Sequence, residues 1–213
     1  MSDFSYVPRT VQYGKRAVDL FAALAGLILC IPLFPLIALI IKLDSPGPVL
    51  FRQQRIGRAL SDRTELFLML KFRTMRLDAE SGSGPVWASK DDPRVTRVGL
   101  FLRKTRLDEL PQLVNVLCGD MSLIGPRPER PGFYQRLDRA IPFFAERTYG
   151  LRPGITGLAQ VHQGYDRDLQ DVRNKVGYDH AYALALSHAG VWFLTDLEIA
   201  VRTLLVMVCG RGQ

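Results

Sequence analysis

The sequence is poor in cysteine, and it lacks the short motifs that mark several common enzyme classes. Its three cysteines, at positions 30, 118 and 209, are odd in number and widely spaced. This excludes a disulfide framework and a cysteine metal site, and it favours a reducing, cytoplasmic-side setting. The glycine motifs of nucleotide-binding loops and the zinc-protease, serine-hydrolase and paired-cysteine motifs are absent. The three histidines do not cluster, so each is typical of a structural histidine.

Acidic residues are fewer than basic ones, and charged residues are absent from one long stretch. The chain has 21 Asp and Glu against 28 Lys and Arg, which gives a net charge of +7. Such an excess indicates an anionic partner: nucleic acid, lipid head groups or phosphorylated substrates. With 23% charged residues in 213 positions there is room for one long apolar segment, which excludes a polytopic membrane protein. A hydrophobic share of 47% excludes intrinsic disorder as the main state.

The uncharged stretch extends over 20–41 and reads LFAALAGLILCIPLFPLIALII. As one helix its 22 residues would be about 33 Å long, enough for a transmembrane anchor. It starts too far from the N-terminus and is too long for a signal peptide. However, Pro32 and Pro35 lie in its middle, and each removes a backbone donor and crowds the preceding turn. Basic residues flank both ends, and such flanks favour the cytoplasmic side. The sequence therefore favours a re-entrant, proline-broken membrane helix at about 17–42.

One acidic residue precedes this stretch, and two interpretations of it stay open. Asp19 pairs with Lys15 or Arg16 at the membrane interface, or it is a solvated charge.

The rest of the chain predicts an α+β, mostly helical fold. Short strands are expected at 49–51 and 65–70. The Gly/Ser/Pro/Asp-rich loop at 78–93 is long enough to act as a mobile lid. Helical periodicity predicts helices at 95–117 (with a break near 107–110), 136–148, 169–188 and 197–209.

The domain organisation follows from these elements. We expect an N-terminal segment, 1–47, that holds the membrane helix, and a small cytoplasmic domain, 48–213. The helix at 197–209 either lies in the membrane interface as an amphipathic helix or packs in the core.

Two adjacent carboxylates, Asp108 and Glu109, lie in the stretch RKTRLDELP at 103–111. Side chains at i and i+1 of a helix point about 100° apart, so they cannot do the same job on one atom. One would attack or bind a metal, while the other orients or shuttles a proton. The alternative is a solvated acidic pair that balances Arg103 and Arg106.

Two later stretches have the composition of phosphate sites. Arg127 lies between two prolines, which restrict its backbone and pre-organise its guanidinium for a phosphate or carboxylate. The loop RPGITG at 152–157 combines an arginine, glycines and a threonine hydroxyl, which suits an oxyanion nest. Together with the acidic pair, these stretches indicate a site for phosphate esters and a divalent cation.

At these residues the chain closely resembles the bacterial sugar transferases, the monotopic phosphoglycosyl transferases. The resemblance extends over nearly the whole chain from about Lys15, in the form of a minimal catalytic unit. The matching stretches are KRAVD at 15–19, the proline-broken helix, PVLFRQQRIG at 48–57, LKFRTM at 70–75, RLDELPQLVNVLCGDMSLIGPRPE at 106–129, RPGITGLAQV at 152–161 and Tyr178-Asp179-x-x-Tyr182.

The resemblance implies transfer of a sugar-1-phosphate from a UDP-sugar to polyprenyl (undecaprenyl) phosphate, which gives a polyprenyl-diphosphate sugar and UMP. In the family's ping-pong mechanism Asp108 would attack the β-phosphorus and form a phosphosugar-aspartyl intermediate. Glu109 would assist, and both carboxylates would bind Mg²⁺. This reaction is the first membrane step in assembling exopolysaccharide, O-antigen, capsule or glycoprotein. The residues expected to bind substrate or phosphate are Lys71, Arg73, Arg106, Arg127, Arg152, Gly154, Thr156 and Asp179.

Further expectations follow from the same resemblance. The chain would lie on the cytoplasmic face of the bacterial inner membrane, contact the lipid bilayer and bind no nucleic acid. Its oligomeric state stays open, with a homodimer as one alternative. Many family members have Ser-Pro at the helix break, whereas this chain has Ile31-Pro32, so another group must satisfy the broken backbone. Two alternatives stay open: a non-enzymatic, membrane-anchored basic scaffold for anionic lipid or nucleic acid, and a soluble transferase with an apolar core helix.

Overall fold

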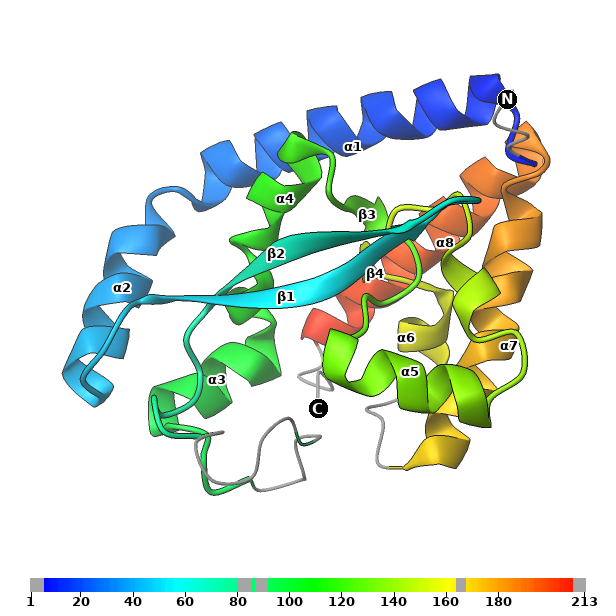
Figure 1. Cartoon of the computed structure of the whole chain (residues 1–213). Coiled ribbons are helices and arrows are strands. Elements are labelled where there is room, and N and C mark those ends of the chain that lie inside the picture. The colour runs from blue at the N-terminus through cyan, green and yellow to red at the C-terminus, as the bar shows by residue number, and fades with distance from the viewer. Residues whose placement is uncertain (1–5, 80–85, 87–91, 164–167, 209–213) are drawn as a thin grey trace.

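The structure is a computed structural model of the chain, and it describes residues 6–79, 86, 92–163 and 168–208. The expected loop at 78–93 lies mostly outside these residues. Helices dominate the described part, which confirms a mixed, mostly helical fold (Figure 1). The elements in chain order are α1 (Arg9–Cys30), α2 (Leu33–Asp44), β1 (Leu50–Ala59), β2 (Thr64–Phe72), α3 (Arg97–Thr105), η1 (Leu107–Glu109), α4 (Gln112–Cys118), β3 (Ser122–Ile124), α5 (Pro131–Ala140), η2 (Ala145–Thr148), β4 (Gly154–Thr156), α6 (Leu158–His162), α7 (Leu169–Ala185) and α8 (Ala189–Val208).

The apolar N-terminal stretch forms two helices with a bend of 62° between them. Among the described helices none alone meets the length and hydropathy of a membrane span, whereas α1 and α2 meet them only together, as a bent pair. The break lies at Ile31, whose N–H donates to Leu27 O (2.7 Å) and whose O accepts from Phe34 N (3.1 Å). The backbone therefore supplies these bonds at the break without a serine. Pro35 lies in the first turn of α2, where a helix needs no backbone donor.

One face of α1 packs on the rest of the protein, and the opposite face is exposed and apolar. Val11, Asp19 and Ala23 are buried at spacings of eight and four residues, as expected for one helix face. Phe21 and Leu29, on the other face, are each more than three-quarters exposed. The helix is therefore both a wall of the folded domain and an apolar surface.

Polar side chains near the start of α1 tie it to three other segments. Lys15 Nζ pairs with Asp196 of α8 at 2.8 Å. Arg16 donates from Nη1 and Nη2 to the carbonyls of the last turn of α4, at 2.6 and 2.9 Å. Asp19 Oδ1 accepts from Ser122 Oγ (3.0 Å) and Leu123 N (2.9 Å). The expectation that Asp19 is solvated is therefore wrong, and its hydrogen bonds go to β3 rather than to the neighbouring cations.

Strands β1 and β2 form an antiparallel hairpin that crosses the middle of the molecule (Figure 1). Both strands are longer than expected, because pairing continues through the polar residues after Phe51. On α4, Asn115 accepts from Leu70 N (3.0 Å) and donates to Leu68 O (2.8 Å), which fastens the free edge of β2 to that helix. The short strands β3 and β4 pair in parallel and have too few residues for their pattern to predict them.

Several helix boundaries differ from expectation. The predicted break near 107–110 is confirmed, since α3 ends at Thr105 and the single 3₁₀ turn η1 leads into α4. The helix expected at 136–148 is divided, because Ile141 has extended backbone angles and Phe143 has a φ of 60°. Helix α8 begins at 189, eight residues earlier than predicted.

We expect Asp19→Ala to lower the midpoint of thermal unfolding in detergent, because the variant leaves the Ser122 hydroxyl and the Leu123 N–H of β3 without their acceptor. The expected loss is about 1–3 kcal/mol, or several degrees. Asp62→Ala is the matched control, since Asp62 is exposed and pairs with the adjacent Arg63. Equal midpoints for the two variants would contradict this account of α1.

Candidate active site

Asp108 and Glu109 both lie on η1, the single turn between α3 and α4. Arg106 adopts a left-handed conformation (φ 59°), which reverses the chain after α3 and directs the turn inward. Each of the two carboxylate residues is only 6% exposed. The interpretation as a solvated acidic pair is therefore wrong.

Glu109 is surrounded by cations from three parts of the chain. Lys71 of β2 contacts Glu109 Oε1 at 2.9 Å, Arg127 contacts the same oxygen at 3.6 Å, and Arg106 contacts Oε2 at 3.8 Å. Burial alone would raise the pKa of Glu109, but these cations outweigh it and hold that pKa at about 2. Glu109 is therefore an anion whose charge is already balanced by the protein.

Asp108 has a different environment although it is the adjacent residue. Its Oδ1 is buried and has no hydrogen-bond partner in the described part of the protein. Burial raises the pKa of Asp108 to about 6, helped by the charge of Glu109 and opposed by Lys71. A buried carboxylate with an unpaired oxygen is reactive toward an electrophile or a cation, because no donor stabilises its charge.

Asp108 lines a cavity of about 400 Å³ beside the hairpin, whose wall combines apolar side chains with many charged ones; we call it the polar cavity. Cations on its wall far outnumber the two acids there, Asp108 and Glu129. Burial, followed by the charge of Arg127, lowers the pKa of Arg55 to about 10, as expected where guanidinium groups are crowded. The basic side chains that line the cavity are Arg55, Lys71, Arg73, Arg76, Arg94, Arg103, Arg127 and Arg130. This cavity is suited to a polyanion.

Arg55 was not among the residues expected from the sequence to bind substrate or phosphate. The alternation of side chains along a strand could have indicated that Arg55 lies at the site. Phe51, Gln53 and Arg55 share one face of β1, and Phe51 lies opposite Lys71 in the β1–β2 register. Placing Lys71 at the site therefore places Arg55 on the same wall, once the register is known.

Arg73 does not have the use predicted for it. Its guanidinium donates to Pro46 O, to Ser45 O (2.7 Å) and to Ile41 O (3.3 Å), at the C-terminal end of α2. The side chain lines the polar cavity, but its donors satisfy the helix end rather than facing a phosphate. Arg73 therefore anchors α2 to β2.

The loop at 152–157 does not form the expected phosphate nest. Gly154 and Thr156 belong to β4, and the Gly154 N–H donates to Pro126 O at 2.9 Å. A Cβ on Gly154 would lie 2.1 Å from the Gly125 nitrogen, so the glycine serves the close approach of two backbones. Arg152 Nε donates to Gly119 O at 2.9 Å. None of the predicted residues in this loop lines the polar cavity.

Asp179 is buried in an ion pair rather than exposed to the cavity. Its Oδ2 accepts from Arg147 Nη1 at 2.8 Å, and Arg147 Nη2 donates to Arg127 O at 3.1 Å. Arg147 also stacks over the ring of Phe144, 4.6 Å from its centroid. Asp179 thus orients Arg147, which in turn holds the backbone of the Pro-Arg-Pro segment that carries Arg127.

Of the two carboxylates predicted to bind Mg²⁺, Asp108 is the one whose environment suits a metal ion. The described residues contain no group of three or more His, Cys, Asp or Glu side chains arranged for a metal. Mg²⁺ commonly binds through one or two carboxylates plus substrate phosphates, and the unpaired Oδ1 of Asp108 suits that mode. The carboxylate of Glu109 is already engaged by Lys71.

We expect Asp179→Asn to lower the unfolding midpoint by about 10 °C, because it leaves a buried guanidinium uncompensated at a cost of about 3–5 kcal/mol. Replacing both partners with apolar residues, as in Arg147→Met with Asp179→Leu, removes both charges and should recover most of the loss. A double variant as unstable as Asp179→Asn would contradict the ion-pair account.

The comparisons with known proteins point to one family. Residues 10–210 match the family model described as bacterial sugar transferase. The UDP-N-acetylgalactosamine-undecaprenyl-phosphate N-acetylgalactosaminephosphotransferase of Aeromonas hydrophila is 44% identical over 198 residues, which cover 93% of this chain and 44% of that protein.

Two relatives are named as UDP-glucose:undecaprenyl-phosphate glucose-1-phosphate transferases. The one from Caulobacter vibrioides is 44% identical over 200 residues, 92% of this chain and 71% of that protein. The one from Escherichia coli is 40% identical over 191 residues, 89% of this chain and 39% of that protein. The chain thus spans less than half of the Aeromonas and Escherichia proteins. These matches confirm the resemblance found in the sequence, and the chain belongs to the bacterial sugar transferase family.

Proposed function

We propose that this protein transfers a sugar-1-phosphate from a UDP-sugar to polyprenyl phosphate. The observation that carries the proposal is Asp108, a buried carboxylate with an unpaired oxygen on the wall of a cation-lined cavity. The relatives named above as undecaprenyl-phosphate sugar phosphotransferases support the same reaction.

The reaction proceeds in two displacements. A carboxylate oxygen of Asp108 attacks the β-phosphorus of the UDP-sugar, a P–O bond of the diphosphate breaks, and UMP leaves. A phosphate oxygen of the acceptor then attacks the same phosphorus, and the bond to Asp108 breaks to give the polyprenyl-diphosphate sugar. In both steps an anion attacks an anion, so cations must offset the repulsion and the charge of the leaving group. Arg55, Arg103 and Arg127 on the cavity wall supply that charge.

The two carboxylates have separate roles. Glu109 fixes Lys71 and Arg127 in place by ion pairs of 2.9 and 3.6 Å, and so positions the cations around the diphosphate. Asp108 has no such pairing at Oδ1 and is the nucleophile. Mg²⁺, when bound through Asp108 and the substrate phosphates, would neutralise diphosphate charge.

The same family membership favours a membrane location. We place the protein on the cytoplasmic face of the bacterial inner membrane, with α1 and α2 as a re-entrant pair. The bend of 62° and the exposed apolar side chains on both helices, such as Phe21 and Leu36, support this topology. A basic scaffold that only binds lipid or nucleic acid gives no reason for a buried acidic pair beside a cavity.

We expect purified protein, incubated with Mg²⁺, undecaprenyl phosphate and a panel of UDP-sugars, to release UMP with at least one donor and to lose this activity with a chelator. Asp108→Asn should abolish both UMP release and the phosphosugar adduct seen by intact mass, because an amide cannot serve as the nucleophile. Asp138→Asn, on the exposed face of α5, is the control. UMP release with no donor would reject the function, and an adduct in Asp108→Asn would move the nucleophile elsewhere.

Topology is testable with single cysteines in a cysteine-free background. Tyr13→Cys, near the start of α1, and Arg63→Cys, after α2, place exposed thiols before and after the uncharged stretch at 20–41. A re-entrant pair predicts that a membrane-impermeant maleimide labels both in inside-out vesicles and neither in intact spheroplasts. Labelling from opposite sides would indicate a broken span.

A further inference from the structure

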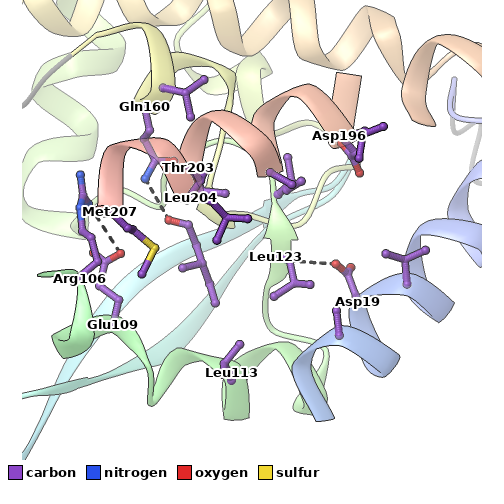
Figure 2. A pocket seen from close by; sticks show the side chains of 18 of the residues that line it. Asp19, Arg106, Glu109, Leu113, Leu123, Gln160, Asp196, Thr203, Leu204 and Met207 are labelled. Atoms are coloured by element: carbon purple, nitrogen blue, oxygen red, sulfur yellow. Dashed lines mark hydrogen bonds and ion pairs between the residues drawn. The ribbon is translucent and has the colours of Figure 1, made fainter. Parts of the chain in front are cut away.

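A second cavity, of about 480 Å³, lies between α1 and α8. Figure 2 shows α8 along one side, α1 on the other, and Leu123 of β3 between them. Its walls are mainly apolar and include Ala22 of α1 and Leu197 and Ala200 of α8. A cavity of this size and lining is typical of a binding site for an apolar ligand.

The charged residues of this cavity lie toward its two ends (Figure 2). At one end Asp196 is engaged by Lys15 (2.8 Å), and Asp19 accepts from β3. At the other end Arg106 and Glu109 form a longer ion pair of 3.8 Å. Only the second end contains a residue of the acidic pair.

The two cavities meet at η1. Asp108 lines the polar cavity, and Glu109, the next residue, lines the apolar one. Lys71, Arg106 and Arg127 place three positive charges around these two carboxylates, so the region carries net positive charge. A ligand with an apolar chain and an anionic head is complementary to this cavity when its head lies at the η1 end.

We propose that the apolar cavity binds the first isoprene units of the polyprenyl phosphate acceptor, with the phosphate at Arg106. The proposal rests on the function proposed above and adds the place of the acceptor. In this ligand the phosphate is attached directly to the apolar chain, so charge and chain meet at one end, as they do in the cavity. A phospholipid, in contrast, has a glycerol between phosphate and acyl chain.

The size of the cavity limits how much of the chain it holds. At roughly 30 Å³ for each water-sized atom, 480 Å³ accommodates about 16 non-hydrogen atoms, or about three isoprene units. The remaining chain would follow the exposed apolar side chains of α8, such as Phe193 and Leu204, toward lipid. In this arrangement the donor lies in the polar cavity and the chain of the acceptor lies in the apolar one, and the two substrates meet at the acidic pair.

The first test varies the length of the acceptor. Phosphates of one, two, three and four isoprene units are compared in detergent with a fixed UDP-sugar. We expect kcat/KM for the acceptor to rise with each added unit up to about three units, because each buries further apolar surface, and then to level off. A kcat/KM that does not depend on the first three units would overturn the proposal.

The second test fills the cavity. Ala200→Phe should lower kcat/KM for the three-unit acceptor at least tenfold and remove the dependence on chain length. Formation of the phosphosugar adduct from donor alone should not change, which also shows that the variant is folded. Val201→Phe is the matched control, because Val201 is the next residue on α8, is half exposed and does not line the cavity. If Ala200→Phe fails to form the adduct, Ala22→Phe fills the cavity from α1 instead.

The outcomes separate the two proposals. Unchanged acceptor kinetics in a filled variant that still forms the adduct would overturn the acceptor site while leaving the proposed function intact. An equal loss of acceptor kcat/KM in Val201→Phe would also overturn the acceptor site. So would a loss in Ala200→Phe seen only when phospholipid is present, because that result would assign the cavity to an acyl chain. Failure of the wild-type protein to release UMP would reject the proposed function itself.

Discussion

The ion pairs of Glu109 are the interaction on which the rest of the site depends. Glu109 joins β2, η1 and the Pro-Arg-Pro segment, since Lys71 lies 38 residues before it and Arg127 lies 18 residues after it. Burying one carboxylate is costly, and here three cations offset that cost. The consequence for Asp108 is indirect: because the cations are directed at Glu109, the adjacent carboxylate keeps one oxygen unpaired in a cavity rich in positive charge.

The apolar helix α1 belongs to the domain as much as to a membrane. Arg16 satisfies carbonyls at the end of α4, and Asp19 satisfies donors of β3, so the helix that carries the apolar stretch also supports the segment after the acidic pair. The α1–α8 cavity exists because α1 is held at its polar end by Lys15 and Asp196 while apolar residues line the space beyond them. The apolar cavity and the acidic pair are thereby held next to each other.

Two arginines support the polar cavity by holding the backbone around it. Arg147 links Asp179 to the carbonyl of Arg127, and Arg73 links β2 to the end of α2. Arg73 itself was expected to bind substrate or phosphate, and so was Asp179, the partner of Arg147. In the structure the Nη groups of Arg73 and Arg147 donate to backbone carbonyls and a carboxylate, because leaving these buried donors unpaired costs free energy.

Local pattern and composition were enough to predict the helix break at Ile31-Pro32 and the turn between two helices at 107–110, and to indicate that Asp108 and Glu109 do not share one role. These depend on proline geometry and on the direction of adjacent side chains, which neighbouring residues determine. The partners of each charge could not be predicted in this way. Arg55 lines the polar cavity because β1 pairs with β2 in one register. Gly154 and Arg152 lie away from that cavity because β4 pairs with β3. The types of charged residue could be identified from the sequence. Which charges meet was decided by the tertiary structure, because ion pairs and cavities join residues far apart in the chain.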